Sequence, residues 1–137
     1  MFTSDDTKKD MINSAFWHLI FALFCAMFGA IYELFSHEVY SFYMIYAFAI
    51  PLVLGTLTQH ILAGLTHINM KGLALSFWNM AVVTLTIGCL FKGVLDIYGT
   101  TNKLILVYPA ASAVLFVLAF IFLIVQRLTR PCSSLTT

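Results

Sequence analysis

The sequence predicts an all-α integral membrane protein, in which four transmembrane helices form an antiparallel up-down bundle. Of the 137 residues, 61% are hydrophobic and 9% are charged, whereas a soluble domain carries roughly 25% charged residues. The mean hydropathy is +0.96. Four apolar stretches are each long enough to cross about 30 Å of hydrocarbon as a helix. Because so few polar residues cannot cover a soluble domain of this size, lipid is expected to surround most of the chain.

The first transmembrane helix is predicted over residues 13–35, after a polar segment of residues 1–12. Its apolar run is longer than the roughly 7–15 residues of a signal peptide and ends without a clear cleavage site, so it is expected to remain as an anchor. Small residues let helices approach closely in lipid. The face toward the bundle is therefore expected to hold a mostly small row at four-residue spacing, formed by Ser14, His18, Ala22, Ala26 and Ala30.

The other three helices are predicted over residues 39–65, 72–95 and 104–126, and residues 127–137 form a tail. Backbone N–H and C=O groups find no water inside the bilayer, so each stretch must satisfy them within a helix. Pro51 lies in the middle of the second stretch and lacks a backbone donor, so a kink that acts as a hinge is predicted there. The short breaks between the stretches predict antiparallel neighbours. One row of the second helix is again mostly small: Ala47, Pro51, Gly55 and Gln59.

The distribution of Lys and Arg predicts the orientation of this four-helix domain of residues 13–126. The positive-inside rule places the side richer in Lys and Arg in the cytoplasm. The side of both termini carries Lys8, Lys9, Lys71, Arg127 and Arg130, and the other side carries Lys92 and Lys103. A multi-pass protein with both termini in the cytoplasm is therefore predicted. Trp17 and Trp78 fall near the cytoplasmic ends of their helices, where an interfacial aromatic belt is expected.

Four polar residues of the predicted helices fall at one depth, roughly one to two helical turns inside the cytoplasmic boundary. When the chain is folded back at its breaks, His18 lies level with Gln59 and His60 of the second helix and with Asn79 of the third. Polar groups inside a membrane are costly and by default indicate function. They can line an opening for a transported ion or solute, or relay protons through a histidine. The alternative is that they hydrogen-bond one another and hold the bundle together.

A redox function is a further interpretation of the same layer. Two histidines on different helices can ligate a haem iron from both sides, as in membrane b-type sites. His18 and His60 would be these axial ligands, and haem b is the one cofactor that the sequence suggests. A carrier of several haems would need a second pair of histidines at the outer side, where His37 stands alone.

Glu33 and His37 form a second candidate site, at the outer end of the first helix. Their four-residue spacing places them on one face if the helix continues, and carboxylate and imidazole groups can bind a divalent cation. Solvation at the helix end is the alternative. Lys92 and Asp96 have the same spacing and are expected to pair along their own helix.

No pattern for catalysis is found in the sequence. It contains neither a Gly-rich phosphate loop nor a G-x-S-x-G motif, and its breaks are too short to build an active site outside the membrane. A net charge of +1 gives no basic surface for nucleic acid. The predicted function is non-enzymatic: a transport component or an accessory subunit, partnered by the lipid bilayer and by a second copy or another membrane protein. An enzyme that acts on lipid or quinone through Glu33 and His37 is the third interpretation.

Overall fold

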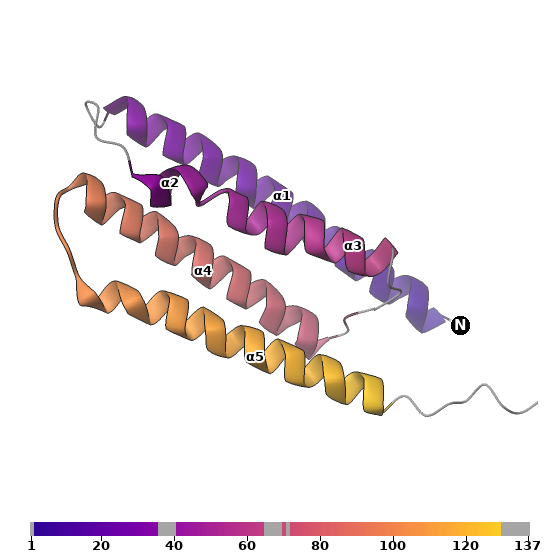
Figure 1. The fold of residues 1–137 in the computed structure, drawn as a ribbon. Coiled ribbons are helices and arrows are strands. Elements are labelled where there is room, and N and C mark those ends of the chain that lie inside the picture. The colour runs from indigo at the N-terminus through magenta and orange to yellow at the C-terminus, as the bar shows by residue number, and fades with distance from the viewer. Residues whose placement is uncertain (1, 36–40, 65–69, 71, 130–137) are drawn as a thin grey trace, which may run out of the picture.

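The computed structural model describes residues 2–35, 41–64, 70 and 72–129, and every regular element in these ranges is helical. Four segments are long and apolar enough to cross a membrane: Asp6–Phe35, Phe42–Gly64, Leu73–Ile97 and Lys103–Leu128. The prediction of an all-helical chain with four such helices is confirmed. Figure 1 shows the segments lying side by side, with the second segment against both the first and the third.

The first segment is one continuous helix, α1 (Phe2–Phe35), which begins well before the predicted residue 13. Residues 2–12 contain neither Gly nor Pro, so no strong helix breaker stops it. Its buried positions recur every three or four residues, at Thr7, Met11, Ala15, His18, Ala22, Cys25 and Gly29. The predicted small row is buried only at His18 and Ala22, because Ser14 and Ala26 are half-buried and Ala30 is exposed. A strict four-residue row turns off the buried face of a helix that has about 3.6 residues per turn.

Pro51 changes the type of helix in the second segment. The helix α2 (Phe42–Tyr46) ends before it, η1 (Pro51–Leu57) is a π-helix that begins at it, and α3 (Thr58–Gly64) follows. A break in the regular α-helix is therefore present where the proline, which cannot donate, predicts one. The wider turns of the π-helix keep a four-residue row on one face, and this buried row contains Ala47, Pro51, Gly55, Gln59 and Ala63.

Side chains complete the hydrogen bonding of this irregular segment. Thr58 Oγ1 donates to the Val53 carbonyl at 2.8 Å, and Trp78 Nε1 donates to the Leu54 carbonyl at 2.9 Å. Trp78 belongs to the third segment, the helix α4 (Leu73–Ile97). Since a buried carbonyl without a donor costs about 1–3 kcal/mol, the indole stabilises the π-helix and joins it to α4.

The turn after α4 follows from Gly99, whose φ is 68°. Its N–H donates to the Asp96 carbonyl and the Thr100 N–H donates to the Leu95 carbonyl at 3.0 Å, which is the Schellman arrangement that ends a helix. The Asn102 side chain then accepts from the Leu104 N–H at 3.0 Å. It caps the 3₁₀ turn η2 (Lys103–Leu106), which leads directly into α5 (Val107–Leu128).

Two glycines allow the helices to approach closely. A Cβ atom added at Gly55 would lie 2.5 Å from His18 Cγ, and one added at Gly88 would lie 2.5 Å from Tyr108 Cβ. The first contact joins the π-helix to α1 and the second joins α4 to α5. Close approach through small residues is the usual packing of helices in lipid, where burial of apolar area gives no driving force. Helices α1 and α5 lie on opposite sides of α4 in Figure 1.

The apolar core lies near the same end of the molecule as the start of α4. It contains Met11, Ala63, Met70, Trp78, Val82 and Ala119. The Trp78 ring packs edge-on against Phe116, with 5.0 Å between ring centroids, and only 6% of the residue is exposed. The prediction that Trp78 belongs to an interfacial belt is therefore wrong, whereas Trp17 is 64% exposed. Position along the sequence gives the depth of a side chain but not the direction in which it points.

Candidate functional site

A hydrogen-bonded network joins three of the four segments at the predicted polar layer. The side-chain oxygen Oδ1 of Asn79 accepts from Gln59 Nε2 at 2.7 Å and lies 3.0 Å from His18 Nε2. Because a carboxamide oxygen only accepts hydrogen bonds, His18 donates through Nε2. A single acceptor on α4 thus holds one donor from α1 and one from α3.

The backbone around His18 fixes the imidazole. Gly55 of the π-helix leaves space for the ring, which is only 5% exposed. The hydroxyl of Thr56 donates to the Ala15 carbonyl at 3.1 Å, which ties the π-helix to α1 one turn before His18. The irregular segment that begins at Pro51 therefore positions the histidine of the network.

Gln59 retains a free acceptor inside the protein. The residue is 1% exposed, and its Oε1 atom has no hydrogen-bond partner within the described part of the chain. A buried amide oxygen left without a donor costs roughly 1–3 kcal/mol. The network is therefore one donor short, and a proton-bearing group that reached Gln59 would be bound favourably.

A groove of about 490 Å³ runs between α1 and α4 and ends at this network. We call it the α1–α4 groove. The polar side chains that line it are Asp10, Asn13, Ser14, His18 and Asn79. Trp17 and Phe21 add aromatic surface. The lining offers oxygen acceptors and one carboxylate, and these groups suit a small cation or a hydrogen-bonding solute.

The structure does not bring His60 to this network. It follows Gln59 on α3, and consecutive helical residues point about 100° apart, so its side chain is exposed while that of Gln59 is buried. Two axial haem ligands must face the same porphyrin from opposite sides. The Nε2 atom of His18 is bound to Asn79, and among the residues that the structure describes His18 and His60 do not form a pair of facing imidazoles.

The predicted outer site can be placed only in part. Glu33 borders a small hollow of about 160 Å³ between α1 and α2, together with Gly29 and Met44. His37 lies outside the described residues. Within those residues, no group of three His, Cys, Asp or Glu side chains is arranged to hold a metal ion. A metal role for Glu33 and His37 stays a prediction.

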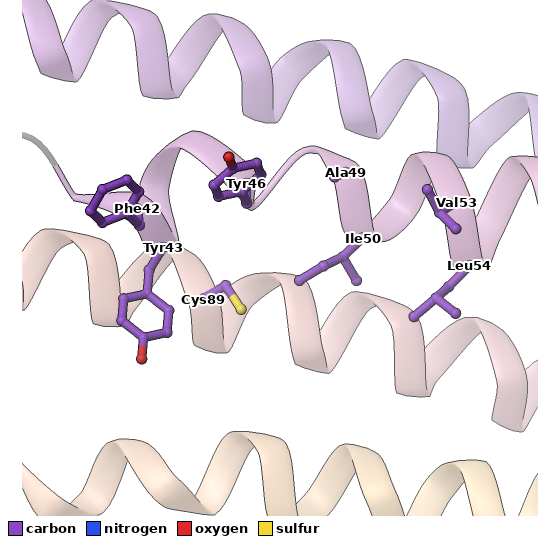
Figure 2. A pocket seen from close by; sticks show the side chains of 8 residues that line it. All are labelled: Phe42, Tyr43, Tyr46, Ala49, Ile50, Val53, Leu54 and Cys89. Atoms are coloured by element: carbon purple, nitrogen blue, oxygen red, sulfur yellow. The ribbon is translucent and has the colours of Figure 1, made fainter.

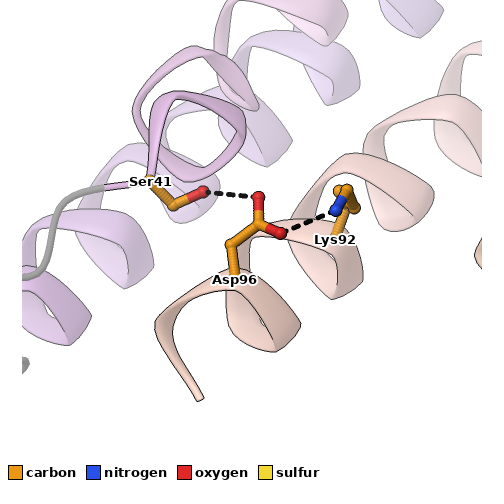
Figure 3. Close-up of polar contacts among 3 residues, drawn as sticks. All are labelled: Ser41, Lys92 and Asp96. Atoms are coloured by element: carbon orange, nitrogen blue, oxygen red, sulfur yellow. Dashed lines mark hydrogen bonds and ion pairs between the residues drawn. The ribbon is translucent and has the colours of Figure 1, made fainter. Parts of the chain in front are cut away.

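The predicted pairing of Lys92 with Asp96 along α4 is confirmed, with 2.6 Å between Lys92 Nζ and Asp96 Oδ1. Ser41 Oγ also contacts the second carboxylate oxygen of Asp96 at 3.5 Å, as Figure 3 shows. The Lys92 ammonium lies 5.5 Å from the centre of the Tyr43 ring. Ser41 and Tyr43 were not predicted to join this cluster, because they belong to another segment of the chain. Their position at the start of the second segment, at the same end of the bundle as Asp96, could have indicated the contact.

No protein-family model matches this chain, and neither a curated protein nor a solved structure is similar to it.

Proposed function

We propose that this chain is a multi-pass membrane protein whose four segments cross the bilayer in antiparallel order, with both termini in the cytoplasm. Three features support the proposal. The four segments are long and apolar, many of their large apolar side chains are exposed, and the Lys and Arg residues favour the side of the termini. Exposed Leu, Ile and Phe side chains on this scale are unfavourable in water and favourable in lipid.

Reporter fusions test the proposed topology. Green fluorescent protein fused after Thr137 is expected to fluoresce, because it folds in the cytoplasm. The same fluorescent protein fused to a chain cut after Gly99, in the turn between α4 and η2, is expected not to fluoresce. A reporter that is active only in the extracytoplasmic space is expected to be active at this position. The opposite pattern, or activity of both reporters at both positions, would contradict the four-crossing arrangement.

The function that the site favours is that of a transport component without catalytic activity. The observation that carries this proposal is the α1–α4 groove, which leads from the polar residues Asp10 and Asn13 to the partly buried His18–Asn79–Gln59 network. The groove would receive a small cation or hydrogen-bonding solute, and the network would bind it by hydrogen bonds. The predicted hinge at Pro51 would move the π-helix against His18, which it contacts at Gly55.

Purified protein in liposomes tests this role with protons and monovalent cations (sodium, potassium and methylammonium). Flux above that of empty liposomes is expected. His18→Ala removes one hydrogen bond of the network and should lower the flux about tenfold, since one such bond is about 1.4 kcal/mol. Asn79→Ala removes both hydrogen bonds and should lower the flux at least as much. His60→Ala is the matched control, because His60 is exposed outside the network, and it should keep the flux. Equal flux from all variants would end the proposal. A Soret absorbance band in the purified protein would instead support the haem alternative.

An accessory subunit is the second candidate function. Only Ser112 and Ala119 of α5 are buried, and its contacts are with α4 and η2. The rest of this helix presents apolar residues such as Val114, Val117 and Ile121 outward. That surface suits either lipid or a helix of another membrane protein. A chain that carries no flux alone but gains it with a co-purified membrane protein would favour this second function.

A further inference from the structure

An apolar groove follows the second span on the side away from α1. Figure 2 shows its walls, which include Tyr43, Tyr46, Ile50 and Leu54 of the second span and Cys89 of α4. Its volume is about 490 Å³, and every residue that lines it is aliphatic, aromatic or a cysteine. We call it the span 2 groove. It has no hydrogen-bonding network of its own, so it suits a hydrocarbon rather than a polar solute.

A second hollow continues the span 2 groove toward α5. It has a volume of about 200 Å³ and shares Tyr43 and Cys89 with the groove. Its other walls come from α4, from η2 and from the start of α5, including Gly88 and Pro109. Lys92 lines this hollow, so a single ammonium group lies among the otherwise apolar residues of the hollow.

The ammonium group of Lys92 can bind an anion there. Asp96 accepts from one of its three N–H donors, and the Lys92 side chain keeps 30% of its surface exposed. In the described part of the chain, the other close contact of the ammonium group is a cation–π contact with the Tyr43 ring, which is not a hydrogen bond. A phosphate oxygen can therefore join Lys92 beside the carboxylate of Asp96. Ser41 and Asp96 lie at the same end, as polar groups at a membrane boundary do.

The length of the groove matches one leaflet of a bilayer. The stretch from Phe42 to Leu54 would measure about 18 Å as a regular α-helix with roughly 1.5 Å of rise per residue, and its break and π-helical part shorten it. Half of the hydrocarbon core of a bilayer is about 15 Å thick. An acyl chain that starts at the Lys92 end would therefore fill the groove and stop near the middle of the membrane.

We infer that the span 2 groove binds one phospholipid, with an acyl chain along the second span and the phosphate on Lys92. This inference rests on the proposed membrane insertion but is independent of the transport role. Apolar complementarity supplies the chain contacts, and a charge-assisted hydrogen bond from Lys92 supplies the contact with the phosphate. The lipid would fill the space between the second span and α5 and link the two.

Cys89 lines both hollows and therefore reports their occupancy. The full chain in maltoside micelles is treated with N-ethylmaleimide, and the labelled peptides are followed by mass spectrometry. Dioleoyl phosphatidylglycerol at about ten times its dissociation constant should slow the labelling of Cys89 about tenfold, because the unoccupied fraction falls by that factor. Cys25, which is 1% exposed in α1, is the internal control, and the lipid should not change its labelling rate.

Two variants and one matched lipid separate the parts of the inference. Lys92→Met should raise the phosphatidylglycerol concentration needed for protection about tenfold, whereas Lys103→Met, a lysine on η2 that does not line either hollow, should not. Ala49→Phe places a ring in the groove and should abolish the protection. Monoolein, which has the same chain without a phosphate, should protect more weakly.

Three results would overturn the inference. The first is a Cys89 labelling rate that phosphatidylglycerol does not change. The second is equal protection by phosphatidylglycerol and monoolein together with no effect of Lys92→Met, which would remove the anion contact. The third is protection that grows with protein concentration in the absence of lipid, which would assign the groove to a second copy of this chain. If Ala49→Phe fails to fold, Lys92→Met and monoolein still decide the question.

Discussion

Replacing Gly55 by leucine is expected to destabilise the protein by about 3 kcal/mol or more, at the upper end of the range for overpacked cores. The first atom of the new side chain would lie 2.5 Å from Cγ and 2.6 Å from Cβ of His18. These atoms are at the base of a buried side chain and cannot swing aside as the end of a flexible one does. The π-helix and α1 must therefore separate, and the bond between His18 and Asn79 should be lost with them. Unfolding in detergent, followed by circular dichroism, measures the effect.

Gly64→Leu is the matched control, since no atom of the described residues lies within 4 Å of a Cβ at that position and the residue is exposed. Its effect should stay within about 0.5 kcal/mol, as for ordinary surface positions. The double variant Gly55→Leu with His18→Ala should recover part of the lost stability, because the ring atom in closest conflict, Cγ, is removed while Cβ remains. A Gly55→Leu protein as stable as the Gly64→Leu protein would show that α1 and the π-helix do not meet as described.

Trp78→Ala is expected to lower the free energy of unfolding by roughly 3–5 kcal/mol, the cost of removing a large buried aromatic residue. The indole fills the space between the π-helix and α5, where it contacts Phe116 and Phe120. Trp78→Phe keeps most of this volume but removes the donor to the Leu54 carbonyl. Its cost should be about 1–3 kcal/mol, from a buried acceptor left without a donor. Denaturant titration of the two variants separates the packing effect from the hydrogen bond.

Trp17→Ala provides the control for the second prediction, because the other tryptophan is 64% exposed on α1. Its effect on stability should be within about 0.5 kcal/mol. Equal destabilisation by Trp17→Ala and Trp78→Ala would contradict the burial of Trp78 and would favour an aromatic belt that includes both residues.

The depth of the residues in the polar layer can be predicted by counting residues along the chain. Helices rise by a fixed distance per residue, and the breaks between them are short, so the level of His18, Gln59 and Asn79 follows from their distance to each break. The direction in which each side chain points does not follow in the same way. The π-helix at Pro51 has wider turns than an α-helix, and it sets which face of α3 meets the bundle. Gln59 faces inward for that reason, and His60 does not.

The sequence by itself determined that this is a helical protein with four segments long and apolar enough for a membrane. These properties depend on composition and on the length of each apolar stretch, which are local. It also determined the pairing of Lys92 with Asp96, because the two residues share one helix face. Only the tertiary structure decided that Trp78 is buried, that Asn79 joins two other helices, and that Ser41 reaches Asp96. Each of these contacts depends on the rotation of one helix against another, and that rotation is fixed by close packing at residues such as Gly55 and Gly88.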